Sequence, residues 1–452
     1  MNSKIDFVKE KTSAGLIKMA VPLLIAMILN MAYNIVDSLW IGNLLGEEAM
    51  AALTSATPIV LILTSIGMGA TNGLTILLSQ AIGAKDKKGV RKLLSTSFIS
   101  SIIFCIGITI LCEISLNGFL SFLQTPDAIF SMVKSYLKIY FVGFLAVYFY
   151  LYFTAVLRSY GNSMFQVAGI LFCTILNGVL DPFFIKYMGI EGAAIATVLS
   201  QTIAVVLMAI YVIKKKLIYV NLKDFDKENL LDLIKKALPS VVQQSIPALS
   251  TTVLTSIVSG FGVTAIAAYG ITGKLETILF YPAMALNMAI TAIIGQCYGA
   301  GRFDRVKDYL KLSLIYGGGL LLVLSALVIV YSNGLSHLFL DSMNVAEIVH
   351  SYFMIVSIGY ILNTVTNCYL GTINGFGRPM MGMFIMIFYY IIVRMPLAYI
   401  LSKSTLLLNG IWWAVLISHI VASISSILIF KVIVNKPGKK ESRNVKGNTA
   451  FN

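Results

Sequence analysis

The stretch Phe172–Ile185 reads FCTILNGVLDPFFI and places a carboxylate, that of Asp181, among almost wholly apolar side chains. Asn177 and Asp181 are four residues apart, so on a helix their side chains lie one above the other on a single face. If this helix crosses a bilayer, an ionised Asp181 facing lipid costs at least about 2.5–3.5 kcal/mol. We therefore expect the acid to face protein or water and to have a partner. The alternative is that Asp181 ends the helix at the membrane surface, beside Pro182.

The composition of the whole chain favours a membrane protein. Of its 452 residues, 58% are hydrophobic and 12% are charged, whereas soluble domains have about 45–50% and about 25%. Apolar runs such as Leu93–Leu111 and Ile139–Leu157 recur along the chain, each near the roughly 20 residues that span a bilayer. The sequence predicts an all-α polytopic membrane protein with twelve transmembrane helices.

The formal net charge of +14 would suit nucleic acid, but Lys and Arg fall in short clusters between apolar runs. With the N-terminus inside, the segments predicted to be cytoplasmic hold 28 of the 34 Lys and Arg residues, and the outer loops hold four. By the positive-inside rule both termini are cytoplasmic. We expect a multi-pass protein of the plasma membrane, with membrane lipids and no nucleic acid as partners, and no separate cleavable signal peptide.

The sequence repeats itself at a nearly constant offset. Leu16-Ile17-Lys18 recurs as Leu233-Ile234-Lys235, Tyr160-Gly161 as Phe376-Gly377, and Gly192 as Gly410. The pattern predicts a duplicated six-helix unit, divided into an N-terminal lobe (1–216), a linker (217–232), a C-terminal lobe (233–435) and a basic cytoplasmic tail (436–452). Because each unit has an even number of helices, both copies begin on the cytoplasmic side and have the same orientation. We therefore expect a pseudo-two-fold axis along the membrane normal to relate them. We also expect the two lobes to enclose a central cavity and to move against each other as rigid bodies.

The first helix carries a second acid. Asn30, Asn34 and Asp37 follow a four-then-three spacing, which predicts one polar stripe. Asp37 and Asp181 come late on outward-running helices, and Thr197 comes early on an inward-running one. All three should fall in the outer half of the bilayer, where they can meet.

Four motifs resemble the MATE (multidrug and toxic compound extrusion) family: DSLWIG at 37–42, QAIGA at 80–84, RSYGN at 158–162 and NGVLDP at 177–182. The likeness covers essentially the whole chain. It implies a secondary active antiporter that exports cationic or amphipathic organic compounds in exchange for Na⁺ or H⁺. One branch of this family has its cation site in the N-terminal lobe. The residues of this chain that match that site are Asp37, Asn177, Asp181 and Thr197. The resemblance implies that they bind the coupling cation and could bind Na⁺.

The other well-known arrangement of this family has an acid in the seventh helix. Here Val241–Thr255 contains only Gln243, Gln244 and hydroxyl groups as polar side chains. This departure favours the N-terminal site.

The chemistry of two acids in one low-dielectric site points to a cation. Two such carboxylates cannot both stay ionised alone, so either one keeps a proton or Na⁺ binds between them. Carboxylate, amide and hydroxyl oxygens suit a hard cation. Asn177 and Thr197 can also act simply as interhelical hydrogen-bond partners.

Further polar and aromatic residues could contribute to a site or cavity. Glu276 and Lys274 lie on different helical faces, so Glu276 belongs either to the bundle interior or to a cavity wall. Arg394 is interpreted as structural, paired with Glu276. Aromatic and sulfur side chains accept varied cations, and the remaining cavity candidates are Tyr33, Asn34, Tyr148, Tyr152, Gln243, Gln244, Phe280, Tyr281, Met284, Phe388 and Tyr389.

Two other functions are alternatives to an antiporter. A lipid-linked oligosaccharide flippase of the same broad superfamily would favour a basic cavity and extra helices. A channel or receptor would not need duplicated lobes with paired acids. The sequence has no Walker pattern, so we expect no ATP coupling. The resemblance to a transporter family implies no enzymatic activity and no cofactor other than the coupling ion. A monomer is sufficient for this architecture.

Overall fold

The computed structural model of the protein describes residues 5–435 except 124, 338 and 341. Within these residues the chain is all helical, without a strand. Twelve helical segments in this described part of the chain are long and apolar enough to cross a membrane, which confirms the predicted fold class. The predicted basic tail, 436–452, lies outside the described residues.

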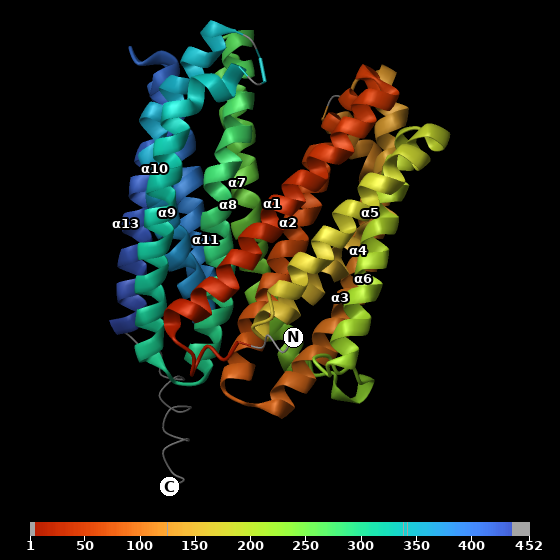
Figure 1. Ribbon diagram of the computed structural model, residues 1–452, viewed down its shortest axis with the longest axis vertical. Helices are drawn as coiled ribbons and strands as arrows, with labels where there is room; N and C mark the ends of the chain where they lie inside the picture. Colours follow the sequence, from red (N-terminus) through yellow and green to blue (C-terminus); the bar gives the residue numbers. More distant parts are fainter. Residues whose placement is uncertain (1–4, 124, 338, 341, 436–452) are drawn as a thin grey trace. The chain divides into compact units, whose positions relative to one another are not determined.

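The spans follow one another along the chain (Figure 1). Figure 1 colours the first six from red to green; they are α1 (Thr12–Leu45), α2 (Glu47–Gly83), α3 (Lys87–Phe122), α4 (Asp127–Ser159), α5 (Met164–Met188) and α6 (Ile190–Lys214). After the short 3₁₀ turn η1 (Leu222–Asp224) come α7 (Lys227–Ser259), α8 (Val263–Gly299), α9 (Phe303–His337) and α10 (Met343–Gly375). The eleventh span consists of α11 (Pro379–Met386), η2 (Ile387–Arg394) and α12 (Met395–Ser402), and α13 (Leu407–Asn435) is the twelfth.

The repeat in the sequence is also a repeat in the backbone. Gly46 and Gly262, 216 positions apart, both have positive φ, at 81° and 96°. Gly161 and Gly377 have the same spacing and φ values of 76° and 77°. Glycine adopts this left-handed conformation without steric cost, so the same turns recur in both halves.

The chain forms two compact units. One runs from Ile17 to Gln244, and the other runs from Ser245 onward and includes Phe7–Leu16. The division falls inside α7, and the segment predicted as a linker docks on α3 within the first unit. Lys92 of α3 forms an ion pair with Asp226 at 2.8 Å, and Asp226 donates its backbone N–H to Thr96 at 3.0 Å.

The same ion pair favours the ionised form of Asp226. The hydrogen bond from Lys92, with those from the backbone N–H groups of Asn229 and Glu228, lowers the pKa of Asp226 below its usual value. A lowered pKa means that the stabilisation is present at neutral pH and is lost only as the pH falls toward that pKa.

The central helix of the first unit is α4. In its apolar membrane-spanning stretch 67% of the residues are buried, whereas 28% are buried in the corresponding stretches of α2 and α5. Tyr148 and Tyr152, two of the candidate cavity residues, belong to this packed core. The hydroxyl groups of Tyr152 and Ser97 lie 2.9 Å apart, and Ser101 donates to the Tyr148 hydroxyl at 3.2 Å. Both tyrosines serve the packing of α3 against α4.

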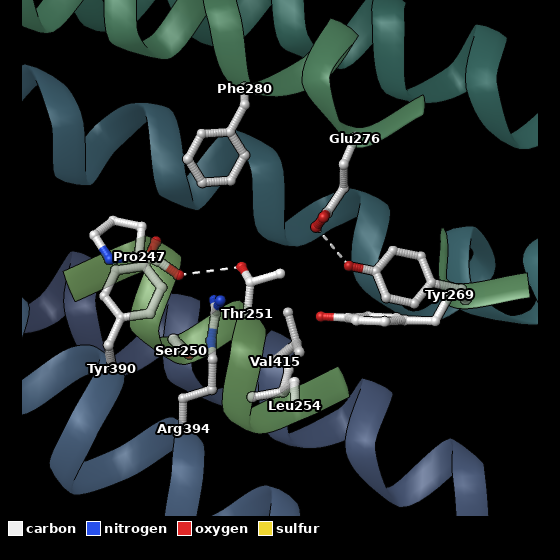
Figure 2. A pocket seen from close by; sticks show the side chains of 11 residues that line it. Pro247, Ser250, Thr251, Leu254, Tyr269, Glu276, Phe280, Tyr390, Arg394 and Val415 are labelled. Carbon is white, nitrogen blue, oxygen red and sulfur yellow. Dashed lines mark hydrogen bonds between the residues drawn. The ribbon is translucent and has the colours of Figure 1, made fainter. Parts of the chain in front are cut away.

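The eleventh span contains a π-helical turn, η2. At its end the Met395 N–H bonds to the carbonyl of Tyr390, five residues earlier, and the following Pro396 has no N–H to donate. This spacing brings Arg394 within reach of Tyr389, whose hydroxyl accepts a hydrogen bond from Nη2 at 2.7 Å. Such turns are frequent at functional sites. In Figure 2, Arg394 points into a cavity of the C-terminal unit.

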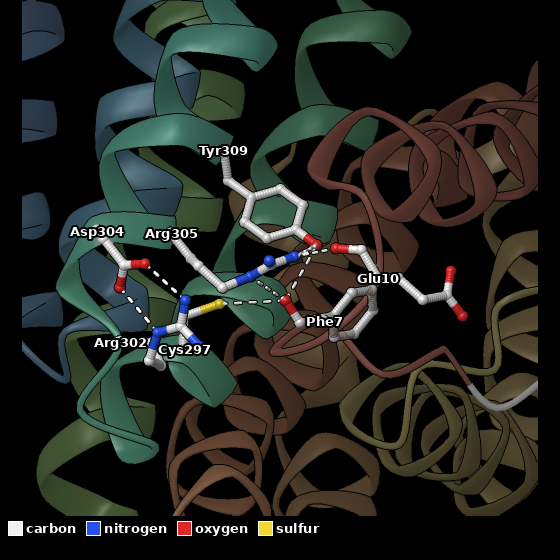
Figure 3. Close-up of polar contacts among 7 residues, drawn as sticks. All are labelled: Phe7, Glu10, Cys297, Arg302, Asp304, Arg305 and Tyr309. Carbon is white, nitrogen blue, oxygen red and sulfur yellow. Dashed lines mark hydrogen bonds and ion pairs between the residues drawn. The ribbon is translucent and has the colours of Figure 1, made fainter.

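The segment that precedes α1 is anchored on the C-terminal unit (Figure 3). Phe7 is fully buried. Arg305 of α9 donates from Nε to the Phe7 carbonyl at 2.8 Å and from Nη2 to the Glu10 carbonyl. Tyr309, one turn later, donates to the same Phe7 carbonyl at 3.2 Å. One guanidinium thus binds two backbone carbonyls of this segment.

Replacing Arg305 by Gln should release this segment, because the guanidinium makes charged hydrogen bonds worth about 1.5–3 kcal/mol each. We expect faster proteolytic cleavage near Glu10, with the twelve spans intact. Lys307→Gln, an exposed site on the same helix, is the matched control. Equal cleavage of the two variants would contradict the anchoring role of Arg305.

Candidate functional site

Four polar residues predicted from the sequence are buried in the N-terminal unit. Asp37 on α1 is 7% exposed, Asn177 and Asp181 on α5 are 0% exposed, and Thr197 on α6 is 5% exposed. Three helices therefore present polar side chains to the interior of one bundle. Burial of two acids without a basic partner is costly, so their immediate contacts decide what the group can do.

Asn177 and Asp181 share one face of α5, as their spacing indicates. Asn177 Nδ2 donates to Asp181 Oδ1 at 2.9 Å. The helix continues through Pro182 and ends at Met188, so the alternative that Asp181 ends the helix is wrong. Two further turns of helix follow Asp181, which places it inside the span.

Asp37 completes the acidic group from α1. Its charge and that of Asp181 interact electrostatically, and Tyr136 of α4 interacts with both acids. Tyr33, one turn before Asp37, packs against Cys173 of α5 and Ala204 of α6. A Cβ added at Gly178 would touch Val36 at 3.4 Å, so α1 and α5 approach closely beside the acids.

Several oxygen atoms of this group lack a hydrogen-bond partner among the described residues. They are Asp37 Oδ1, Asp181 Oδ2, Asn177 Oδ1 and the Tyr33 hydroxyl. Leaving a buried polar atom unsatisfied costs about 1–3 kcal/mol. Three of the four are acceptors only, so what they lack is positive charge or protons. Oxygen ligands of this kind fit Na⁺, and the two carboxylates equally fit a shared proton.

Not all predicted residues join this group. Asn34 is exposed, and its side-chain amide donates to the carbonyl of Asn30 at 2.8 Å. Asn30 and Asn34 are exposed whereas Asp37 is buried, so only the Asp37 end of the polar stripe on α1 faces the interior of the bundle. Gln243 is buried and Gln244 half-buried on α7, one turn before the first α7 residue that lines the cavity described next.

The C-terminal unit holds a second polar group, around a cavity (Figure 2). Glu276 of α8 accepts at Oε1 from the hydroxyl groups of Tyr352, at 2.6 Å, and of Tyr360. Arg394 donates to Ser418 at 2.9 Å and to Tyr389. Both charges line the cavity, so Glu276 lies in a cavity wall. The ion pairs of the described residues do not join it to Arg394, and the interpretation as a direct pair is wrong.

The aromatic candidates divide according to the face of the helix on which they lie. Phe280 lines this cavity, whereas its neighbours Tyr281 and Met284 are half-buried and do not. Tyr389 is buried beside Arg394, and Phe388 is exposed.

Sequence reasoning missed Tyr136 beside the acids and Ser250 and Tyr352 in the cavity. A signal was present, because Tyr136 and Tyr352 are 216 positions apart and thus equivalent in the repeat.

Comparison with known proteins decides the family. The sequence model of the MatE family matches this chain twice, over residues 22–183 and 239–400. The chain belongs to the MATE family. The two matched segments lie 217 positions apart, which is the offset of the internal repeat.

Relatives of this chain are named as multidrug resistance proteins or transporters. The "Probable multidrug resistance protein YoeA" of Bacillus subtilis is 28% identical over 87% of this chain and 88% of its own. The "FAD transporter" of Shewanella oneidensis is 26% identical over 85% and 86%. A crystal structure described as MATE in complex with MaL6 superposes with a TM-score of 0.90 at 22% identity, over 96% of this chain and 99% of the other, and shows the shared fold. The chain is therefore a multi-pass membrane protein of a multidrug-efflux transporter family.

Proposed function

We propose that this MATE transporter is a secondary active antiporter, which exports cationic or amphipathic organic compounds in exchange for Na⁺ or H⁺. The coupling cation binds at Asp37, Asn177, Asp181 and Thr197. One observation carries the proposal: three buried acceptor oxygens, from α1 and α5, lack donors in the described part of the chain. A bound cation or proton satisfies them.

The coupling follows from differential affinity. A ligand shifts two conformations only by the difference in its affinity for them. With the site empty, two neighbouring carboxylates repel each other, and occupation by a cation removes this repulsion and draws α1 toward α5. The conformation with α1 and α5 close is therefore the one that the coupling ion favours, and in it the exported compound is released.

The coupling ion is identified by imposing the two gradients separately. Proteoliposomes containing the purified protein and a fluorescent organic cation receive an inward Na⁺ gradient at equal pH, or an inward H⁺ gradient without Na⁺. We expect concentrative transport with at least one gradient, and none after Asp37→Asn with either. Transport that neither gradient drives would contradict antiport, and full transport by Asp37→Asn would remove that residue from the site.

A further inference from the structure

The cavity of the C-terminal unit is the repeat equivalent of the acidic group in the N-terminal unit. Ser250 and Leu254 lie 217 positions after Tyr33 and Asp37, and Val415 lies 218 after Thr197. All three, with Tyr352, line this cavity. The duplicated scaffold therefore offers the same pocket twice, and in the second copy apolar side chains replace Asp37 and Thr197.

The second pocket has a different charge. Figure 2 shows Glu276 from α8 and Arg394 from the π-helical turn entering the cavity from opposite sides. The first pocket holds two acids, whereas the second holds one acid and one guanidinium, so the cavity offers a separated pair of opposite charges.

The bonding of Arg394 leaves donors for a ligand. Only 8% of this residue is exposed. Nε donates to Ser418, and Nη2 donates to Tyr389 and lies 3.3 Å from His419 Nε2. None of the hydrogen bonds found among the described residues involves Nη1. The hydrogen-bond partners of the guanidinium are all neutral, and Nη1 has two N–H donors for an anionic oxygen.

Two further side chains that line the same cavity have atoms available for hydrogen bonds to a ligand. Ser250 is 1% exposed, and its hydroxyl has no partner within the described chain. Glu276 receives both of its tyrosine hydrogen bonds at Oε1, so Oε2 remains to accept from a donor. A ligand in the cavity can therefore accept hydrogen bonds near Arg394 and donate one to Glu276.

The size of the cavity restricts the ligand to a small polar group. Its volume is about 50 Å³, and a water needs about 10–15 Å³ of such space. Aromatic side chains of Tyr269, Phe280 and Tyr390 form part of the wall, which suits an apolar body attached to that group.

We propose that this cavity binds an amphoteric headgroup, with a carboxylate at Arg394 and Ser250 and a protonated amine at Glu276. The inference builds on the proposed efflux function, since it names a class of exported compound: zwitterions with an apolar body. Its test measures binding without any ion gradient, so it and the efflux proposal can fail separately.

The test uses three ligands that differ in one charged group each. Phenylalanine carries both charges, phenethylamine lacks the carboxylate, and 3-phenylpropionate lacks the amine. Affinities for the purified full-length protein in lipid nanodiscs follow from the ligand-dependent rise of its unfolding midpoint. We expect phenylalanine to bind at least about tenfold more tightly than either analogue, because each lost hydrogen bond to a charged group costs about 1.5–3 kcal/mol.

Substitutions test which residue binds which charged group of the ligand. Arg394→Gln should remove the advantage of phenylalanine over phenethylamine, and Glu276→Gln its advantage over 3-phenylpropionate. Ser250→Ala should weaken phenylalanine about fivefold, while Ser256→Ala, an exposed serine of the same helix, should not. If Arg394→Gln does not fold, the other two variants still decide. Equal affinity for the three ligands, no binding at millimolar concentration, or unchanged binding by Ser250→Ala and Glu276→Gln would overturn the proposal.

Discussion

Replacing Asp181 by Asn is expected to abolish ion-driven efflux while the protein stays folded. The amide is nearly isosteric, and its oxygen can still accept the hydrogen bond that Asn177 donates to Oδ1. The substitution removes one of two buried negative charges and so removes the charge that binds the cation. Loss of a charged interaction of about 1.5–3 kcal/mol weakens ion binding by about 10- to 150-fold. The measurement is concentrative transport in proteoliposomes, with the unfolding midpoint measured in parallel.

The matched control is Asp127→Asn, which neutralises an exposed acid at the start of α4. We expect this variant to transport like the unmodified protein. If Asp181→Asn transports as well as Asp127→Asn, the acidic group has no part in coupling.

Gly192→Ala and Gly410→Ala should each destabilise the protein, by about 2–3 kcal/mol. A Cβ at Gly192, at the start of α6, would overlap the carbonyl oxygen of Phe184 in α5. In the second half, a Cβ at Gly410 would overlap the carbonyl oxygen of Leu401. Overpacking costs about 1–3 kcal/mol, and the upper part of this range applies because the obstacle is backbone. The free energy of unfolding in a denaturing-detergent titration measures the loss.

Gly318→Ala serves as the control for both. An added Cβ at this position of α9 meets nothing within 4 Å, and Ala in a helix is favoured over Gly by about 0.5–1 kcal/mol. We therefore expect this variant to be slightly more stable than the unmodified protein. Equal stability of Gly192→Ala and Gly318→Ala would mean that the α5–α6 junction is looser than described.

Much of the fold could be predicted because bilayer thickness and duplication leave strong periodic signals. The number of helices could be predicted from twelve apolar runs that are long enough to span a bilayer. Repeated glycines such as Gly161 and Gly377 indicated equivalent turns, and both have positive φ in the structure. The partnership of Asn177 and Asp181 followed from helical spacing alone.

Other features depend on helix phase and local geometry, which composition does not set. Asn34 and Asp37 are three residues apart, yet one is exposed and the other buried, and their spacing alone does not show how much of that face the bundle covers. The π-helical turn before Pro396 shifts the register of the eleventh span, so the partners of Arg394 could not be read from ordinary helical spacing.

If the acids of α1 and α5 hold the coupling cation, their removal should abolish a bound cation that can be counted. Equilibrium binding of radioactive Na⁺ to the purified protein, together with potentiometric proton titration of the same samples, compares the unmodified protein with the double variant Asp37→Asn/Asp181→Asn. We expect a saturable Na⁺ site or a titrating proton in the unmodified protein that is missing from the double variant. Identical Na⁺ binding and identical proton titration by the two proteins would contradict it.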